Sequence, residues 1–203
     1  MKIICVGRNY SEHAKELNNA IPEKPILFLK PQTALLLDDK DFYYPNFSKD
    51  VHFECELIFR ICKNGKSISK KFAKEYYDAV SLGIDFTARD LQQKQKEKGL
   101  PWEIAKAFDH SAVVGKWKKL TEEEKENQYN FELKQNEKIV QQGNSEEMIF
   151  SLDELLAEIS TYFYLNIGDI IFTGTPSGVG PISIGDKFEG FLENEKIFET
   201  CIK

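Results

Sequence analysis

Apolar and polar residues alternate over short stretches along much of this chain of 203 residues, which is the pattern of half-buried β-strands. The pair Asn64-Gly65 and the polar segments 135–138 and 193–196 separate such stretches and predict three β-hairpins. Strands are predicted at residues 2–6, 26–30, 52–62, 80–86, 131–134, 139–142, 169–173, 187–192 and 196–202.

Helical periodicity is limited to a few segments. Serine residues at the start of 11–17 and 69–77 predict the N-caps of two short helices. Segments 87–90 and 151–154 have the spacing of a capping box, so each predicts the start of a longer helix. The helix that follows 87–90 is expected to end at Gly99, because glycine commonly terminates helices.

Strands outnumber helices in this pattern, and no repeat or long linker divides the chain. We therefore expect an α+β fold that is mainly β, with a few helices at its periphery. The length suits one domain that spans residues 1–203.

Composition and charge narrow the range of partners. Apolar residues make up 41% and charged residues 30% of the chain, and the net charge is −6. Because no long basic run is present, we expect no nucleic-acid partner. No apolar stretch approaches membrane-spanning length, so we expect no membrane association. The cysteines Cys5, Cys55, Cys62 and Cys201 lack metal-ligand spacing and predict reduced thiols in a cytoplasmic protein.

Three acidic residues within apolar strands are the sharpest chemical feature. Glu54 and Glu56 project from one face of the strand predicted at 52–62, roughly 6.5 Å apart. Most such pairs lie on solvated edge strands, but Ile58 continues the same face and Asp85 has apolar neighbours. Like charges in such surroundings need a raised pKa, a basic partner or a cation. Three converging carboxylates would form a hard oxygen site for Mg²⁺ or Mn²⁺.

Other titratable residues carry weaker signals. His52 shares the face of the two glutamates, where it is a fourth metal ligand, a residue that orients a ligand, or a strand-end histidine. His13 and Glu16 are neighbours on a helix, either as an exposed pair or as a general base with its orienting carboxylate. Lys106 has apolar neighbours, so its ammonium either extends to solvent or enters an anionic site.

Segment 173–180, rich in glycine and threonine, follows an apolar strand. It lacks the Gly-Lys-Ser/Thr ending of a P-loop. It is either a tight turn or a nest of backbone N–H groups that receives a carboxylate together with the Thr175 hydroxyl.

Six segments match one protein family in their residues and in their order along the chain. They are GRNYSEHAKE at 7–16, FLKP at 28–31, HFECEL at 52–57, IDFTARDLQ at 84–92, KGLPWEIAKAFD at 98–109 and GDIIFTGTPSGVG at 168–180. Together they resemble the fumarylacetoacetate hydrolase family over nearly the whole chain. The short length and the KGLPW–AK segment look most like its acylpyruvate hydrolase and oxaloacetate decarboxylase type. The resemblance implies a mixed β-sandwich roll, a homodimer and one Mg²⁺ or Mn²⁺ per chain.

The resemblance also implies a role for individual residues. Its metal ligands fall on Glu54, Glu56 and Asp85. Its catalytic residues fall on His13, Glu16 and Lys106, and its substrate-binding residues on Arg8, Arg89, Gln92 and Thr175.

The activity implied is divalent-metal-dependent cleavage of a small 2-oxo acid through a metal-bound pyruvate enolate, as acylpyruvate hydrolysis, oxaloacetate decarboxylation or both. His13, oriented by Glu16, would take a proton from water, and Lys106 would offset the developing charge. One alternative is a hydratase, isomerase or tautomerase acting on a 2-oxo (di)carboxylic acid such as 2-hydroxyhepta-2,4-diene-1,7-dioate or oxaloacetate. The other is a non-catalytic protein that binds 2-oxo acids.

Overall fold

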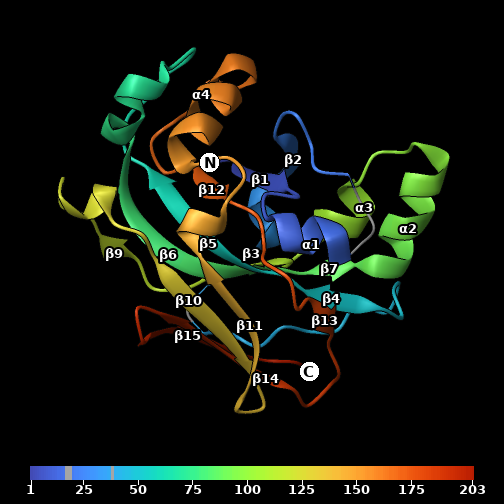
Figure 1. Cartoon of the computed structure of the whole chain (residues 1–203). Helices are drawn as coiled ribbons and strands as arrows, with labels where there is room; N and C mark the ends of the chain where they lie inside the picture. The colour runs from blue at the N-terminus through green and yellow to red at the C-terminus, as the bar shows by residue number, and fades with distance from the viewer. Residues whose placement is uncertain (17–19, 38) are drawn as a thin grey trace.

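The computed structural model describes residues 1–16, 20–37 and 39–203, and it is mainly β, as the sequence predicts. Three sheets form the body of the molecule, and a few helices lie around them (Figure 1). Helices α1, α2 and α3 gather at one side of the view, whereas α4 lies at another. No helix in these residue ranges is long and apolar enough to cross a membrane.

The largest sheet has eight strands in the order β2-β1-β12-β5-β6-β8-β3, with β9 paired to β6. Its strands are β1 (Ile3–Gly7), β2 (Ile26–Lys30), β3 (Leu35–Leu36), β5 (Cys55–Ile61), β6 (Tyr77–Asp85), β8 (Ala112–Val114), β9 (Lys118–Lys119) and β12 (Ile170–Phe172). The four-stranded sheet contains β11 (Lys138–Asn144), β10 (Asn130–Gln135), β14 (Lys187–Leu192) and β15 (Glu195–Cys201). The three-stranded sheet contains β13 (Gly180–Pro181), β4 (Val51–Phe53) and β7 (Thr87–Ala88).

Two helix termini form as the sequence predicts. The capping box predicted at 151–154 is present, with both of its hydrogen bonds, at the start of α4. Helix α2 ends at Gly99, whose φ of 63° lies in the left-handed region. The α-helices are α1 (Ser11–Glu16), α2 (Arg89–Lys98), α3 (Glu103–Lys106) and α4 (Leu152–Tyr162), and the 3-10 helices are η1 (Gln32–Ala34), η2 (Lys70–Glu75), η3 (Glu124–Glu126) and η4 (Ser145–Glu147).

The eight-stranded sheet buries apolar side chains on both of its faces. Along β5, Leu57 packs into the main core against the four-stranded sheet and α4, whereas Ile58 packs into a second cluster on the opposite face. Along β1, Ile4 belongs to the main core and Cys5 to the second cluster. This alternation follows from the two-residue period of a strand, and it assigns the glutamate side of β5 to the second face.

Three local predictions differ from the structure. The Asn64-Gly65 hairpin is wrong, because residues 62–76 join β5 to β6 and Gly65 pairs with Leu165 instead. The strand predicted at 52–62 is divided at Glu54 into β4 and β5. The capping box at 87–90 does not form, because Thr87 lies in β7 and donates its hydroxyl to the Asp85 carbonyl. The predicted end of α1 at residue 17 lies outside the described residues.

The other two predicted hairpins are confirmed. Strands β10 and β11 are joined at Asn136 and Glu137, which have φ values of 50° and 68°. Strands β14 and β15 are joined at Glu193 and Asn194, with φ values of 49° and 66°. Positive φ at both central residues is the geometry that matches the twist of paired strands.

Buried Asn9 holds the segment after β1 in place. Its side-chain amide donates to the carbonyl oxygens of Phe150 (3.1 Å) and Thr173 (2.8 Å), and its Oδ1 accepts from the Phe150 N–H (2.8 Å). The contacts join β1, the turn after β12 and the segment before α4. Position 9 therefore fixes where α1 begins relative to the sheet.

We predict that Asn9→Ala lowers the free energy of unfolding by about 3 kcal/mol, because buried backbone groups of Phe150 and Thr173 lose their partners. Chemical denaturation measures this loss. The control Asn127→Ala, at an exposed position, is expected to change it by less than about 0.5 kcal/mol. Equal effects of the two substitutions would contradict this role for Asn9.

Candidate active site

Three carboxylates from neighbouring strands meet at one point. Glu54, Glu56 and Asp85 each offer an oxygen, and these oxygens lie within 4.8 Å of one another. All three residues are buried. Glu56 lies opposite Gly83 in the β5–β6 pair, and the Asp85 N–H donates to the Glu54 carbonyl at 2.8 Å. Antiparallel pairing thus brings together acids that are about thirty positions apart in the sequence.

The division of the predicted strand at Glu54 has a structural reason. Strand β4 pairs with β7 and β13 in the small sheet, whereas β5 pairs with β6 and β12 in the large one. Glu54 is the residue at which the chain passes from one sheet to the other. Its side chain therefore lies where the two sheets meet, beside that of Asp85.

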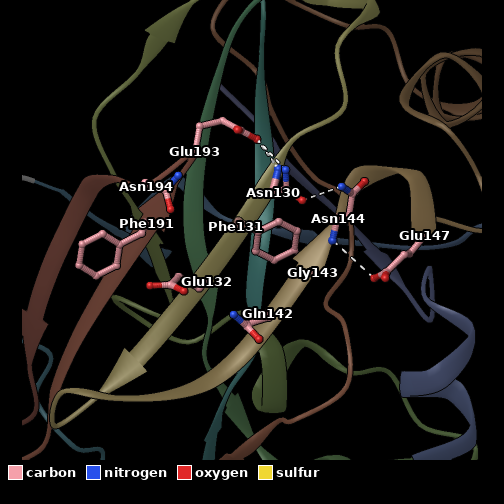
Figure 2. A pocket seen from close by; sticks show the side chains of 10 residues that line it. All are labelled: Asn130, Phe131, Glu132, Gln142, Gly143, Asn144, Glu147, Phe191, Glu193 and Asn194. Atoms are coloured by element: carbon pink, nitrogen blue, oxygen red, sulfur yellow. Dashed lines mark hydrogen bonds between the residues drawn. The ribbon is translucent and has the colours of Figure 1, made fainter.

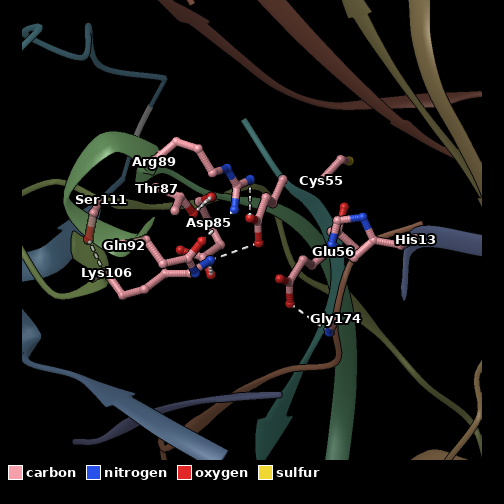
Figure 3. Close-up of polar contacts among 12 residues, drawn as sticks. His13, Cys55, Glu56, Asp85, Thr87, Arg89, Gln92, Lys106, Ser111 and Gly174 are labelled. Carbon is pink, nitrogen blue, oxygen red and sulfur yellow. Dashed lines mark hydrogen bonds and ion pairs between the residues drawn. The ribbon is translucent and has the colours of Figure 1, made fainter. Parts of the chain in front are cut away.

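Three cationic side chains contact the carboxylates, and Figure 3 shows two of them, Arg89 and Lys106. The Lys106 ammonium lies 2.7 Å from both Glu54 Oε2 and Asp85 Oδ2. Arg89 contacts Glu54 Oε1 at 2.7 Å, and the fully buried Lys30 lies 2.7 Å from Asp85 Oδ1. Glu54 and Asp85 are thus both charge-compensated by the protein.

The electrostatic environment differs between the two glutamates. Burial favours a raised pKa at Glu54, but Lys106 and Arg89 outweigh it and hold that pKa below its ordinary value. Burial raises the pKa of Glu56 well above its ordinary value, and the charges of Asp85 and Glu54 raise it further. Burial also disfavours the charge on Lys106, yet Asp85 and Glu54 keep the pKa of that lysine above its ordinary value.

This set of donors fits a divalent cation. Carboxylate oxygens are the ligands that Mg²⁺ and Mn²⁺ prefer. Glu56 accepts a hydrogen bond from the Gly174 N–H at 2.7 Å, and within the described ranges it makes no ion pair. A cation of two positive charges among the three acids would supply the compensation that Glu56 lacks.

His13 and Glu16 lie at the same site. His13 is buried and lines the cavity that contains the three acids. Its Nδ1 lies 3.1 Å from Glu16 Oε2, and Glu16 Oε1 accepts from the Gly178 N–H at 3.0 Å. Helix α1 is thus attached by Glu16 to the turn between β12 and β13. When Nδ1 carries the proton toward Glu16, Nε2 is free to accept one.

The glycine-rich segment 173–180 holds Glu56. The Gly174 N–H donates a hydrogen bond to the Glu56 carboxylate. The sequence analysis predicted a carboxylate as one possible partner of this segment but did not say which one. Gly174 has a φ of 97°, and a side chain there would approach the Cβ of Asn9 to 2.8 Å. The Thr175 hydroxyl accepts a hydrogen bond from the Gln141 amide at 2.8 Å. Sequence reasoning did not identify Gln141.

Nine of the ten residues to which the family resemblance assigns a role line one cavity. The tenth, Glu16, contacts His13 of that cavity. The cavity is small, about 30 Å³, and lies between β1, β5, β6, α2 and α3. Helix α2 contributes Arg89 and Gln92, which are joined by a 2.7 Å hydrogen bond. The sequence-predicted residues that line it are Arg8, His13, Glu54, Glu56, Asp85, Arg89, Gln92, Lys106 and Thr175.

Comparison with known families places this geometry in context. Residues 2–203 match the family model of the fumarylacetoacetate (FAA) hydrolase C-terminal domain. The chain belongs to the fumarylacetoacetate hydrolase family. This confirms the resemblance that its sequence motifs carry.

Members of the family with named activities are similar to this chain throughout. The mitochondrial oxaloacetate tautomerase FAHD1 of Bos taurus is 38% identical over 189 residues, which cover 92% of this chain and 85% of that protein. The crystal structure of fumarylpyruvate hydrolase from Pseudomonas aeruginosa with Mn²⁺ and pyruvate has a TM-score of 0.94 at 32% identity, and the match covers 100% of this chain and 89% of that one. The crystal structure of 5-carboxymethyl-2-hydroxymuconate delta-isomerase from Mycobacterium smegmatis has a TM-score of 0.86 at 30% identity, and the match covers 99% of this chain and 78% of that one.

A larger cavity lies elsewhere on this family member. It measures about 440 Å³ and is bounded by β10, β11 and the β14–β15 turn (Figure 2). Two of its acids are already in use, because Glu193 accepts from the Asn130 N–H and Glu147 from the Asn144 N–H. The cavity contains none of the residues that the sequence singled out. Size alone is therefore a poor guide to the site in this chain.

Lys30 is a site residue that sequence reasoning missed. Its ammonium also donates to the Ser111 hydroxyl at 2.8 Å and to the Lys106 carbonyl, so it connects β2 to the segment that carries Lys106. The sequence signal that could have identified Lys30 is its position in the FLKP segment, one of the six that carry the family resemblance. His52 lies outside the group of converging acids, and its Nε2 contacts Asp50 at 2.9 Å.

We predict that Lys30→Met lowers the free energy of unfolding by about 3–5 kcal/mol, because it leaves Asp85 buried beside the other acids with one cation fewer. Chemical denaturation measures the change. The control Lys63→Met removes an exposed ion pair with Glu75, and we expect it to leave the unfolding midpoint nearly unchanged. A Lys30→Met protein as stable as this control would show that the pair with Asp85 is not required.

Proposed function

We propose that this chain is a divalent-metal-dependent enzyme that hydrolyses a carbon–carbon bond in a small acylpyruvate-type 2-oxo acid. The observation that carries the proposal is the contact of buried His13 with Glu16 beside three converging carboxylates. Binding alone needs no base, so this pair disfavours a non-catalytic 2-oxo acid-binding protein. The likeness to a fumarylpyruvate hydrolase that binds Mn²⁺ and pyruvate supports the same reading.

Glu54, Glu56 and Asp85 would hold one Mg²⁺ or Mn²⁺ per chain. When bound, this cation supplies Lewis acidity toward the carboxylate and 2-oxo oxygens of the substrate. Arg89 and Lys106 both contact Glu54. They keep its carboxylate ionised and therefore available as a ligand.

His13 would act as the general base for water. With Nδ1 hydrogen-bonded to Glu16, its Nε2 accepts a proton from a water molecule, and the hydroxide attacks the carbonyl carbon distal to the 2-oxo acid. The Gly178 N–H holds Glu16 in position for this step. Because His13 is buried, few water molecules other than the one it activates can reach its imidazole.

Lys106 would stabilise the negative charge that develops on the attacked carbonyl oxygen. The bond between that carbon and the neighbouring CH₂ then breaks, and its electron pair stays with the pyruvate fragment. The proton taken by His13 completes pyruvate, and the other product is a carboxylic acid. Gln92 and Thr175 would bind the substrate, and with oxaloacetate the same fragment would form by loss of CO₂ without water.

A second candidate is tautomerisation of oxaloacetate. It is favoured by the relatives named oxaloacetate tautomerase, which are 36–38% identical to this chain. His13 would then move a proton between the carbon next to the 2-oxo group and the 2-oxo oxygen, with no cleavage of a carbon–carbon bond. Release of pyruvate distinguishes hydrolysis or decarboxylation from tautomerisation, which leaves all four carbons together.

We predict that His13→Ala lowers kcat for acylpyruvate hydrolysis by about 10²–10⁴-fold, the range typical of a lost general base. Oxaloacetate decarboxylation, which needs no water activation, is expected to fall by less than about 10-fold. Both rates are measured as pyruvate release in the presence of Mn²⁺. Equal losses of the two activities would contradict the assignment of His13 to water.

We also predict that Mg²⁺ or Mn²⁺ raises the melting temperature, because a ligand that binds only the folded state stabilises it. Glu56→Gln removes one ligand charge, so this rise is expected to disappear. Thermal unfolding with and without the metal measures both effects. The control Glu195→Gln, at an exposed position, should retain the rise, and a Glu56→Gln protein that retains it would refute the ligand set.

A further inference from the structure

Gln141 is a buried amide that connects the four-stranded sheet to the candidate active site. It lies on β11 and is 2% exposed. Its Oε1 accepts a hydrogen bond from the Cys55 N–H at 2.9 Å, and its Nε2 donates to the Thr175 hydroxyl at 2.8 Å and to the Pro176 carbonyl at 3.0 Å. One side chain thus contacts both the strand that carries the glutamates and the turn after β12.

The two ends of the Gln141 amide are distinguishable because two of its partners have fixed roles. The Cys55 N–H can only donate, and the Pro176 carbonyl can only accept. The amide oxygen must therefore face Cys55, and the amide nitrogen must face Pro176 and Thr175. A reversed amide would place donor against donor and acceptor against acceptor in a buried position, which costs free energy at both ends.

This orientation determines the role of the Thr175 hydroxyl. A hydroxyl has one proton, and its oxygen here accepts from Gln141. Thr175 is buried and lines the cavity that contains the three acids. In the part of the chain that the structure describes, its hydroxyl donates to no acceptor. The proton is therefore available to an acceptor that enters the cavity, such as an oxygen of a bound 2-oxo acid.

The other end of the amide holds the backbone between two of the three acids. Cys55 lies between Glu54 and Glu56, and it is the first residue of β5. Strand β12 pairs with β5 at residues 58–60, so its pairing does not reach Cys55. Gln141 supplies the acceptor for this N–H instead. The same amide that orients the hydroxyl therefore also fixes the strand that carries the acids.

We propose, building on the proposed function, that Gln141 is a positioning residue for substrate binding. It fixes Thr175 as a hydrogen-bond donor toward an oxygen of the bound 2-oxo acid, although Gln141 itself does not line the cavity. A donor that is oriented before the substrate arrives loses little rotational freedom on binding, which favours affinity.

The competing role for Gln141 is a structural one. Its three hydrogen bonds join β11, β5 and the turn after β12, so removing them would loosen these contacts whatever Thr175 does. The two roles differ in one respect, because only the positioning role requires the Thr175 hydroxyl. Substitution of both residues therefore separates them.

The test measures binding of pyruvate to the Mn²⁺-loaded chain by calorimetry. Gln141→Glu keeps an acceptor for the Cys55 N–H, but its carboxylate takes the Thr175 proton and leaves no donor for the ligand. We expect the Kd for pyruvate to rise at least about 10-fold, as is typical of a lost hydrogen bond to a charged group. Gln142→Glu adds the same charge at the exposed neighbouring position, and its Kd should stay within about 2-fold of wild type.

A double-mutant cycle then separates the two roles. Thr175→Val removes the hydroxyl, so in that background Gln141→Glu should change the Kd by less than about 3-fold. In a Thr175→Ser background, which keeps a hydroxyl, Gln141→Glu should again raise the Kd about 10-fold. Gln141→Met removes the amide without adding a charge, and it carries the same comparison where the carboxylate variant does not fold.

An equal effect of the Gln141 substitution with and without the Thr175 hydroxyl would overturn the inference, because a structural role or an added charge acts alike in both backgrounds. The cycle measures binding, so its result does not depend on turnover. A loss that requires the hydroxyl, in a chain that hydrolyses no acylpyruvate, would support the inference and refute the proposed hydrolase function. A wild-type chain that binds no pyruvate with Mn²⁺ would overturn both.

Discussion

Burial of three like charges at one point is the constraint on which the rest of this structure depends. Glu54, Glu56 and Asp85 are buried with oxygens within 4.8 Å of one another, so each raises the cost of ionising the others. Lys106 and Lys30 offset part of that cost through contacts of 2.7 Å. Breaking such pairs is costly, so the contacts of Lys30 in β2 and Lys106 in α3 help to fix both elements relative to the carboxylates.

The fold positions these charges by ordinary sheet geometry. Strand alternation assigns Glu56 to the face of β5 that also carries Ile58, and the antiparallel partner brings Asp85 beside Glu54. The turn after β12 then contacts both parts of the candidate chemistry, because Gly174 binds Glu56 and Gly178 binds Glu16. One glycine-rich turn therefore couples the position of the acids to the position of helix α1.

Sequence reasoning succeeded where the signal was local. The hairpins at 135–138 and 193–196 and the capping box at 151–154 form because neighbouring residues alone determine them. The same local signals fail at Asn64-Gly65 and at 87–90. Gly65 pairs with Leu165, and Thr87 pairs with His52 in β4. At both places, pairing with a distant segment overrides the local turn or cap signal. The sequence predicted that Glu54 and Glu56 share one face, because side chains alternate between the two faces of a strand. The position of Asp85 beside Glu54 depends on the register of β5 and β6, and the role of Lys30 depends on a contact with α3. Neither the register nor that contact is determined by residues that are neighbours in the sequence.

The arrangement of charges also indicates why metal and substrate binding would be coupled at this site. The Lys106 ammonium contacts Glu54 Oε2 and Asp85 Oδ2, which belong to the group of residues that would ligate a divalent cation. A cation held by these oxygens would leave donors of Lys106 available for a new acceptor in the cavity. The proposed substrate would supply that acceptor, so binding of the cation would favour binding of the substrate.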